Sequence, residues 1–354
     1  MLRGVRNIEQ GVLEFATGWN CVVGPNGSGK TSLLEGLHCV ALGRSHRTGV
    51  WHEVVRRGSQ AASVHAEFED DQGFQRRLSL RAGAGERRLE IDGFRPVTLA
   101  EAAAICPLVM LSQQTVQVFR QAAADRVAVL DWVLFHVEPG FLATWRRYRQ
   151  TLRQRNAALR SGADDRPWRD QLAVSGQALH AARARIVPEV ADVFRKMAHE
   201  LATLAVPDLE LAAGWPAEME LAAALDRSAA LDRKQGFTRV GPHRADLVIR
   251  GAALDARRHG SGGQLRLVAY LLRLAQVEIL RRHCGRLAVV LFDDIDAELD
   301  AESLRGLVTT LDRLDAQVVA TTVRPENLAS LGIDPQLFHV EQGRFSEGRD
   351  RMAR

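Results

Sequence analysis

A glycine-rich segment near the N-terminus carries the clearest chemistry in this sequence. Residues 24–32 read Gly-Pro-Asn-Gly-Ser-Gly-Lys-Thr-Ser, and they join the apolar run 20–23 to an apolar stretch at 33–42. In this G-x-x-x-x-G-K-T pattern, backbone N–H groups surround a β-phosphate and the helix N-terminus adds positive charge. We expect Lys30 to reach the β- and γ-phosphates and the Thr31 hydroxyl to ligate Mg²⁺. The predicted nucleotide-binding residues here are Gly24, Pro25, Asn26, Gly27, Ser28, Gly29, Lys30, Thr31 and Ser32.

A second motif lies near the other end of the chain. The apolar run 287–292 has the length of a buried strand and ends in Asp293-Asp294. This pattern resembles a Walker B strand, in which Asp293 would hold Mg²⁺ through its water shell and Asp294 would orient or deprotonate the attacking water. A buried strand followed by an acidic turn is the alternative, and the P-loop in the same chain favours the Walker B interpretation.

Between these motifs, Ser261-Gly262-Gly263-Gln264 precedes the apolar stretch 265–280. Ser261 could simply cap a helix. However, S-G-G-Q at the start of a helix ahead of Walker B resembles the signature of ABC-type ATPases, in which this segment contacts the γ-phosphate held by another subunit. The resemblance implies an ATP-dependent homodimer, with Asp300 in the D-loop along its interface.

Lys30 and Ser261 lie much further apart than the corresponding residues of a transporter ATPase, so an insertion is expected. Apolar residues recur at helical spacing over 141–201, with a polar turn at 161–166, and predict an antiparallel helical hairpin kinked near Pro188. A helix is expected over 125–137 and an antiparallel meander over 64–92. The predicted fold is α/β, a P-loop ABC-type ATPase head with an inserted helical lobe. Its expected parts are 1–112 (N-terminal ATPase half), 113–235 (inserted lobe) and 236–354 (C-terminal ATPase half).

Several blocks resemble the RecF family of recombination-mediator and gap-repair ATPases. They are residues 34–48, 130–141, 154–160, 241–247 and 298–300, and they cover nearly the whole chain. The resemblance implies binding of ATP with Mg²⁺ and of single- and double-stranded DNA, as in a gapped duplex. It further implies RecR as a protein partner and help in loading the RecA recombinase.

The chain departs from the family at three points. Its signature has Gly262 where RecF proteins usually have Arg, and Ala297 replaces the D-loop serine. Either Gln113 or Gln114 could be the Q-loop ligand to Mg²⁺, and Gln113 is weakly favoured. A threonine at 321–322, where transporter ATPases carry a switch histidine, fits the family, and we expect it to donate a hydrogen bond to phosphate.

The residue types predict slow ATP hydrolysis. Asp294 is one methylene shorter than the glutamate of fast ABC ATPases, no histidine supports it, and positioning errors near 1 Å cost on the order of a hundredfold in rate. Slow turnover suits a switch in which an ATP-bound dimer clamps DNA and hydrolysis releases it. A head that binds ATP without hydrolysing it, or a transport-coupled ATPase, stays open as an alternative.

Arginines on the first hairpin helix are the main candidates for contacting DNA. Arg146, Arg149, Arg153 and Arg160 fall within an arc of about 60° at ~100° per residue, with no acidic residue between 140 and 162. Phosphate contacts of this kind are sequence-independent and salt-sensitive. A solvated or partner-binding face is the alternative. Secondary candidates are Arg47, Arg239, His243 and Arg244, of which Arg244 could instead pair with Asp246.

Composition sets the class of protein. The 354 residues are 46% hydrophobic and 25% charged with a net charge of +4, which is typical of a globular protein. No apolar run is long enough to span a bilayer and no signal peptide is apparent, so we expect a cytoplasmic protein without a membrane partner. The four cysteines lie far apart and predict neither a disulfide framework nor a zinc site.

Overall fold

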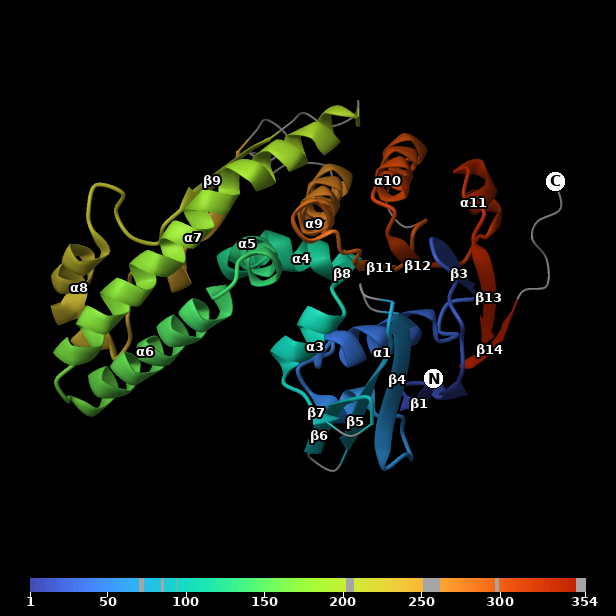
Figure 1. Cartoon of the computed structure of the whole chain (residues 1–354), viewed down its shortest axis with the longest axis horizontal. Coiled ribbons are helices and arrows are strands. Elements are labelled where there is room, and N and C mark those ends of the chain that lie inside the picture. Colours follow the sequence, from blue (N-terminus) through green and yellow to red (C-terminus); the bar gives the residue numbers. More distant parts are fainter. Residues whose placement is uncertain are drawn as a thin grey trace. The chain divides into compact units, whose positions relative to one another are not determined.

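The computed structural model describes residues 1–69, 73–83, 86–93, 95–201, 207–250, 262–296 and 299–347. Contacts within the chain group it into two units (Figure 1). The first comprises Met1–Val116 with Leu280–Arg354, and the second comprises Gln117–Ile279. One lobe is therefore assembled from both ends of the chain, and the other is inserted between them.

A six-stranded sheet with a parallel core, here called sheet B, carries the motifs of the first unit. Its strand order is β14-β13-β3-β12-β11-β8, and only β14 runs antiparallel to its neighbour. The carboxyl ends of the parallel strands therefore meet at one edge of the sheet, where ligands bind in open α/β folds. The strands are β3 (Trp19–Val23), β8 (Leu108–Leu111), β11 (Val289–Phe292), β12 (Gln317–Thr322), β13 (Gln336–Glu341) and β14 (Arg344–Glu347).

The second sheet of this unit, sheet A, is antiparallel in the order β2-β1-β4-β5-β6-β7. Its residues alternate between a buried and an exposed face, as expected for a sheet covered on one side. The predicted meander over 64–92 is confirmed and forms the middle of this sheet. The strands are β1 (Leu2–Val5), β2 (Ile8–Gly11), β4 (Ala61–Glu69), β5 (Gln75–Gly83), β6 (Glu86–Ile91) and β7 (Arg95–Pro96).

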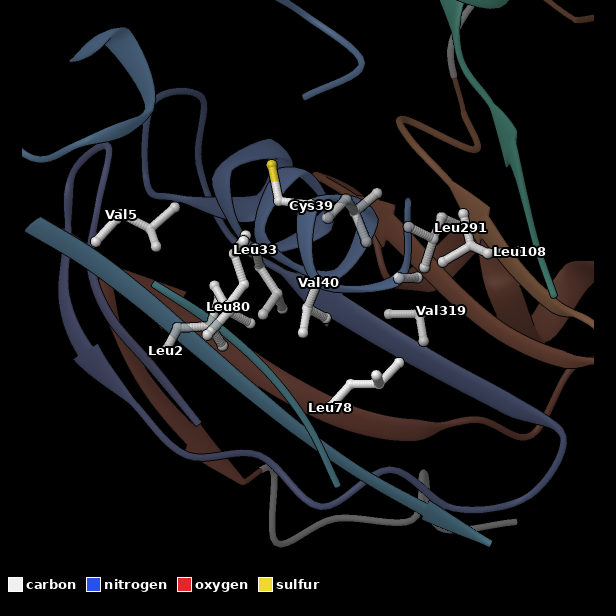
Figure 2. Close-up of a cluster of buried hydrophobic side chains, with 14 of the residues drawn as sticks. Leu2, Val5, Leu33, Cys39, Val40, Leu78, Leu80, Leu108, Leu291 and Val319 are labelled. Carbon is white, nitrogen blue, oxygen red and sulfur yellow. The ribbon is translucent and has the colours of Figure 1, made fainter. Parts of the chain in front are cut away.

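Helix α1 (Lys30–Leu42) follows the P-loop and packs against strands of both sheets. Leu33, Cys39 and Val40 of this helix meet Leu80 of sheet A and Val319 of sheet B in one hydrophobic core (Figure 2). A helix covered on several sides needs apolar residues around most of its circumference, as α1 has. The remaining helices of this unit are α2 (Trp51–Val54), α3 (Leu99–Ile105), α10 (Ala301–Arg313) and α11 (Glu326–Ser330).

The second unit is built around the predicted helical hairpin. Helices α6 (Phe141–Ser161) and α7 (Arg166–His199) pack along each other, and α7 continues through Pro188 as one helix. The other elements are α5 (Ala123–Val137), β9 (Asp208–Ala212), α8 (Leu221–Gln235), η1 (Pro242–Arg244) and β10 (Asp246–Arg250), together with most of α4 (Gln113–Gln121) and α9 (Gly262–Cys284).

The second boundary between the units differs from the expected one. Residues 236–250 and 262–279, assigned from sequence to the C-terminal ATPase half, group with the helical unit instead. Strand β10 pairs with β9, Arg183 donates to the Pro242 carbonyl at 2.8 Å, and Gln276 donates to the Val129 carbonyl at 3.0 Å. The pairing of β9 with β10 could not be predicted from the sequence, because the two strands are separated in the chain by α8.

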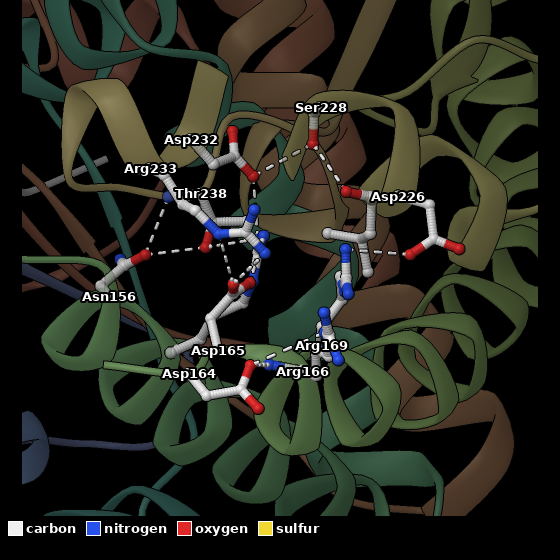
Figure 3. Close-up of polar contacts among 12 residues, drawn as sticks. Asn156, Asp164, Asp165, Arg166, Arg169, Asp226, Ser228, Asp232, Arg233 and Thr238 are labelled. Carbon is white, nitrogen blue, oxygen red and sulfur yellow. Dashed lines mark hydrogen bonds and ion pairs between the residues drawn. The ribbon is translucent and has the colours of Figure 1, made fainter. Parts of the chain in front are cut away.

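A buried ionic network joins α6, α7 and α8 near the hairpin turn (Figure 3). The Arg155 side chain is fully buried and lies within 3.1 Å of the Asp165 carboxylate and 2.9 Å of the Asp232 carboxylate. Its guanidinium also donates to the Thr238 hydroxyl at 3.0 Å. Because buried charges are tolerated only when they are paired, this network specifies how the three helices meet.

Candidate functional site

The P-loop connects β3 to α1 in a conformation that requires glycine. Gly29 has a φ of 123° and Gly27 a φ of 77°, both in the left-handed region that side chains disfavour. The Lys30 ammonium group folds back over the loop and donates to the carbonyl oxygens of Gly24 at 2.7 Å and Pro25 at 3.1 Å. The loop carbonyls thus hold the lysine at the mouth of the loop.

The same loop fits a phosphate group. The Ser28 hydroxyl is buried and has no hydrogen-bond partner among the described residues. A buried hydroxyl of this kind normally finds a partner, so its orphaned state points to a ligand that would supply one. At Gly24 an added Cβ would lie 2.3 Å from the Val340 carbonyl oxygen, so the loop tolerates no side chain there. Residues 24–30 therefore form a closely fitted cradle.

The two Walker B carboxylates lie at the same edge of sheet B. Asp293 follows β11, and its Oδ1 accepts hydrogen bonds from the hydroxyls of Thr31 at 3.1 Å and Thr321 at 2.8 Å. Asp294 adopts a left-handed φ of 51°, its N–H donates to the Thr321 hydroxyl at 2.7 Å, and it lines the adjacent pocket. The Thr321 hydroxyl thus donates to Asp293 and the Thr322 hydroxyl donates to Asp296, and a hydrogen bond from this threonine pair to phosphate stays a prediction.

This arrangement supplies a suitable donor set for Mg²⁺. A hydroxyl oxygen of α1 and a carboxylate oxygen of Asp293 lie 3.1 Å apart, and hard divalent cations prefer such oxygen ligands. Burial raises the pKa of Asp293 from its usual value, and the neighbouring charge of Asp294 adds to the shift. A bound cation would favour the ionised carboxylate, so Thr31 and Asp293 fit the metal role that the sequence assigned to them.

A cavity of about 720 Å³ opens beside the P-loop, and its lining includes more cationic than acidic side chains. Lys30 and Arg47 were predicted site residues, whereas Arg6, Arg56 and Arg57 were not. Such a cluster suits a polyanionic ligand, because arginine forks match phosphate oxygens. Arg47, a candidate for DNA, is placed by the structure in this pocket.

A buried carboxylate positions two of these arginines. Glu35 of α1 is fully buried and accepts from Arg6 at 2.7 and 2.8 Å, from Arg47 at 3.2 Å and from the Ser45 hydroxyl at 2.5 Å. Burial alone would raise the pKa of Glu35, but the hydrogen bonds from Arg6 and Ser45 outweigh it and hold the pKa below its usual value. Glu35 therefore stays charged and fixes Arg6 and Arg47 at the pocket wall.

Asn7 braces the P-loop from the turn between β1 and β2. Its side-chain amide donates to the Gly27 carbonyl at 2.9 Å and accepts from the Ser32 hydroxyl at 2.8 Å. On the far side of the loop, the Gly343 N–H donates to the Ser28 carbonyl at 2.7 Å. Sequence reasoning missed Asn7, because its contacts are with residues 20 and 25 positions away in the chain and no local pattern reveals them.

The remaining predicted site residues belong to the Q-loop, the D-loop and the signature segment. Gln113 is the first residue of α4 and follows β8, the strand next to β11, while Gln114 comes one residue later, so the choice of Q-loop residue stays a prediction. Asp300 caps α10 by accepting from the Ser303 N–H and hydroxyl, both at 2.8 Å, and these bonds lower its pKa. Gly262, Gly263 and Gln264 begin α9, whereas Ser261 and Ala297 lie outside the described residues.

The four hairpin arginines share one exposed side of α6. Arg146, Arg149, Arg153 and Arg160 are all exposed, and none forms an ion pair with a described residue. The Arg149 guanidinium lies over the Trp145 ring at 5.4 Å.

The segment 236–244 runs beside this row of arginines. Thr238 donates to Asn156 of α6 at 2.7 Å, and Tyr148 lies 2.6 Å from His243. Burial lowers the pKa of His243 to about 4, so it is neutral at physiological pH and adds no positive charge to this face. Arg244 does not pair with Asp246, whose carboxylate binds Arg126 at 2.7 and 2.8 Å; Arg244 instead lies over the Phe237 ring at 5.7 Å.

No helix in the described ranges is long and apolar enough to cross a membrane. Over the same residues, no group of three or more His, Cys, Asp and Glu side chains could hold a metal ion.

Comparison with known proteins agrees with this geometry. The family model described as the RecF/RecN/SMC N terminal domain matches residues 1–345. The chain is 36% identical to the DNA replication and repair protein RecF of Chromohalobacter salexigens, covering 97% of each chain. It is also 36% identical to the RecF of Azotobacter vinelandii, covering 98% of this chain and 97% of the relative.

Solved structures show the same fold. A RecF–ATP structure of the RecFOR pathway superposes with a TM-score of 0.84 at 22% identity, covering 98% of this chain and 96% of that one. An Smc head bound to the C-terminal winged-helix domain of ScpA matches with a TM-score of 0.56 at 17% identity, covering 98% and 95%. The fold is thus that of the RecF and SMC ATPase heads, and the chain belongs to the RecF family.

Proposed function

We propose that this protein is an ATP-dependent DNA-binding protein of replication and recombinational gap repair, which uses slow ATP hydrolysis as a switch. The observation that carries the proposal is the meeting of Thr31, Asp293, Asp294 and Thr321 beside a P-loop whose Ser28 hydroxyl lacks a partner. Relatives that match nearly the whole chain are named DNA replication and repair proteins, and a solved structure of the same fold is named as a complex with ATP. We place the activity in the cytoplasm.

Each residue of the site has its own role in the proposed hydrolysis. Lys30 exchanges the carbonyls of Gly24 and Pro25 for the phosphate oxygens of ATP. Bound Mg²⁺ supplies charge neutralisation at the phosphates, and Thr31 and Asp293 are the residues that would hold it. Asp294 orients the attacking water from its left-handed turn. Because its carboxylate is one methylene shorter than that of a glutamate, we expect slow turnover.

The switch requires a second copy of the chain. Ser261, Gly262, Gly263 and Gln264 would contact the γ-phosphate bound to the partner copy, and Asp300 would lie along the interface. ATP binding then closes the dimer around DNA and hydrolysis opens it. Through RecR and gapped DNA, the cycle would help load the RecA recombinase.

DNA contacts are assigned to the hairpin row formed by Arg146, Arg149, Arg153 and Arg160. These side chains are exposed and free of ion pairs among the described residues, and the neighbouring segment 233–244 contains no acidic residue. Unpaired arginines on one helix side favour sequence-independent contact with phosphates.

Phosphate release tests the enzymatic part. The wild-type protein should release phosphate from ATP slowly, and Lys30→Ala and Asp293→Asn should reduce release to background because they remove the phosphate and metal contacts. If neither variant differs from the wild type, the site is not the hydrolytic site. If the wild type binds ATP without releasing phosphate, the protein is a structural head rather than an ATPase.

Charge reversal tests the DNA face. Arg149→Glu with Arg153→Glu should weaken duplex binding and reduce its salt dependence, because both residues would contact phosphates. Arg147→Glu with Arg227→Glu is the matched control, since these exposed arginines of the same unit lie outside the hairpin row, form no ion pair with a described residue and change the net charge equally. Equal affinity and salt dependence in both double variants would remove DNA binding from the hairpin.

A further inference from the structure

The outward face of sheet A carries a row of basic residues that the nucleotide site does not use. On the inward face, Leu2, Val64, Leu80 and Leu89 stand opposite one another across β1, β4, β5 and β6, and all four are buried. Successive residues of a strand point to opposite faces, so the adjacent cross-strand row must point outward. That row, here called the sheet A row, is Arg3, Ser63, Arg81 and Arg88.

The sheet A row places like charges side by side. Arg81 stands directly opposite Arg88, and Arg3 lies two strands away beyond Ser63. Like charges directly opposite on neighbouring strands destabilise a sheet. The fold therefore gains nothing from this arrangement, which indicates a role in binding an anion.

Few neighbouring carboxylates neutralise these charges. Arg3, Arg81 and Arg88 are all exposed. Arg88 pairs with Glu90, but neither Arg3 nor Arg81 forms an ion pair with any residue in the described ranges. The row thus presents two uncompensated guanidinium groups beside a third that is held in place.

The row borders a cavity of about 760 Å³ whose other lining groups are mainly hydrogen-bonding. Ser59, Ser63 and Ser79 contribute hydroxyls. The two carboxylates that line the cavity are each paired, Glu9 with Arg56 at 3.6 Å and Glu90 with Arg88. His65 lies 2.9 Å from the Ser79 hydroxyl, and burial lowers its pKa, so the positive charge of this face comes from the arginines.

We propose that the sheet A row binds the sugar–phosphate backbone of DNA, as a second contact surface on the ATPase lobe. This inference rests on the proposed DNA-binding function but concerns a different site from the hairpin. The row spans three inter-strand spacings, about 14 Å in all, which corresponds to roughly four phosphates at ~3.4 Å of rise per strand of duplex. Arginines and serine hydroxyls are common phosphate donors and carry no base specificity.

The chemistry of the row favours a nucleic-acid backbone over an acidic protein. Protein interfaces are built around buried aromatic or aliphatic anchors. The four outward positions of the row carry only arginine and serine, and the cavity beside it has no aromatic lining residue except His65. Contact with this face would therefore be electrostatic and sensitive to salt.

Salt-dependent binding of a gapped duplex tests the assignment in the full chain. Replacing Arg3→Gln and Arg81→Gln removes two phosphate contacts, so the slope of log affinity against log salt should fall by about 1.8. If the variant and the wild type bind equally at 1 M salt, this smaller slope corresponds to roughly 60-fold weaker binding by the variant at 0.1 M salt. Arg44→Gln with Arg305→Gln is the control of equal charge in the same unit, because both residues are exposed, form no ion pair with a described residue and lie outside the row.

The outcomes of this experiment distinguish a failure of the sheet A assignment from a failure of the proposed function. Wild-type protein that fails to bind the duplex would refute the proposed function itself. Wild-type binding combined with the same slope in the Arg3/Arg81 variant and its control would overturn the sheet A row alone, and would leave that face to an acidic protein. Arg81→Thr is a second test variant that we expect to fold normally, because it removes one of the two like charges that stand opposite each other at Arg81 and Arg88. It should keep the wild-type melting temperature and still reduce the slope by about 0.9.

Discussion

Replacing Thr321 by valine should shift the pH dependence of ATP hydrolysis. The Thr321 hydroxyl donates to the Asp293 carboxylate at 2.8 Å and accepts the Asp294 N–H at 2.7 Å. A hydrogen bond to a charged group contributes about 1.5–3 kcal/mol. Its loss disfavours the ionised form of Asp293, and one pKa unit corresponds to ~1.36 kcal/mol, so the pKa of Asp293 should rise by about 1–2 units.

The assay is phosphate release at fixed Mg²⁺ between pH 5 and 9. Ionised Asp293 is the active form, so its rate is lost as the pH falls through its pKa. The acid limb of the Thr321→Val profile should therefore lie about 1–2 pH units above that of the wild type. The variant should also need more Mg²⁺ for half-maximal rate, because a more basic carboxylate is protonated more often.

Two variants make this result interpretable. Thr321→Ser keeps the hydroxyl and should restore the wild-type profile. Thr310→Val removes a buried threonine hydroxyl that bonds only locally, to the Gly306 carbonyl at 2.9 Å, and should leave the profile unchanged. Superimposable pH profiles for Thr321→Val and the wild type would refute the claim that Thr321 positions the Walker B carboxylate.

Three further predictions concern stability. Arg155→Ala should lower the free energy of unfolding in urea by about 3–5 kcal/mol, because Asp232 would be left buried without a cation and Asp165 would keep only the half-exposed Arg233; a loss below ~1 kcal/mol would contradict the network's role. Burial lowers the pKa of His243 to about 4, so the fold should lose up to ~3 kcal/mol of stability through this residue as the pH falls from 6.5 towards 4. His243→Gln should reduce the slope over this window without abolishing it, because burial also lowers the pKa of His46 to about 4; an unchanged slope would contradict burial of the neutral His243 ring. The pKa of Glu35 is lowered from its ordinary value of 4.5, so its charge stabilises the fold above pH 4.5 and this stabilisation is lost as the pH falls through the lowered pKa. Glu35→Gln should therefore lower stability by ~3 kcal/mol at pH 7, measured by thermal unfolding, and equal stability of the two proteins would show that the charge is dispensable.

The motifs of the nucleotide site could be predicted because each is contiguous in sequence. The P-loop and Walker B patterns each combine a strand, a turn and characteristic residues, so their positions follow from local spacing. Parallel pairing of strands β3, β12 and β11 then brings Thr31 and Asp293 together. Thr321 was predicted as a site residue, but its contact with Asp293 was not, because that contact depends on the order of strands in the sheet.

Residues that act across long separations escaped prediction. Arg6, in a strand turn, pairs with the buried Glu35 of α1, and neither has a local pattern that reveals the other. The hairpin was predictable from its helical spacing, yet the extent of its unit was not, because β10 returns to pair with β9. Arg155 lies fully buried on a helix in which most other arginines face solvent, and its charge gave no sign of that burial.

The central claim is that ATP bound at the P-loop switches DNA binding on. It is tested most directly by fluorescence anisotropy of a gapped duplex titrated with protein in ATP and Mg²⁺, in ADP, and without nucleotide, with the mass of the protein measured in each state. Tight binding and a dimer only in ATP, both lost in Lys30→Ala, are the predicted result. Equal affinity in all three states from a protein that stays monomeric would contradict the switch.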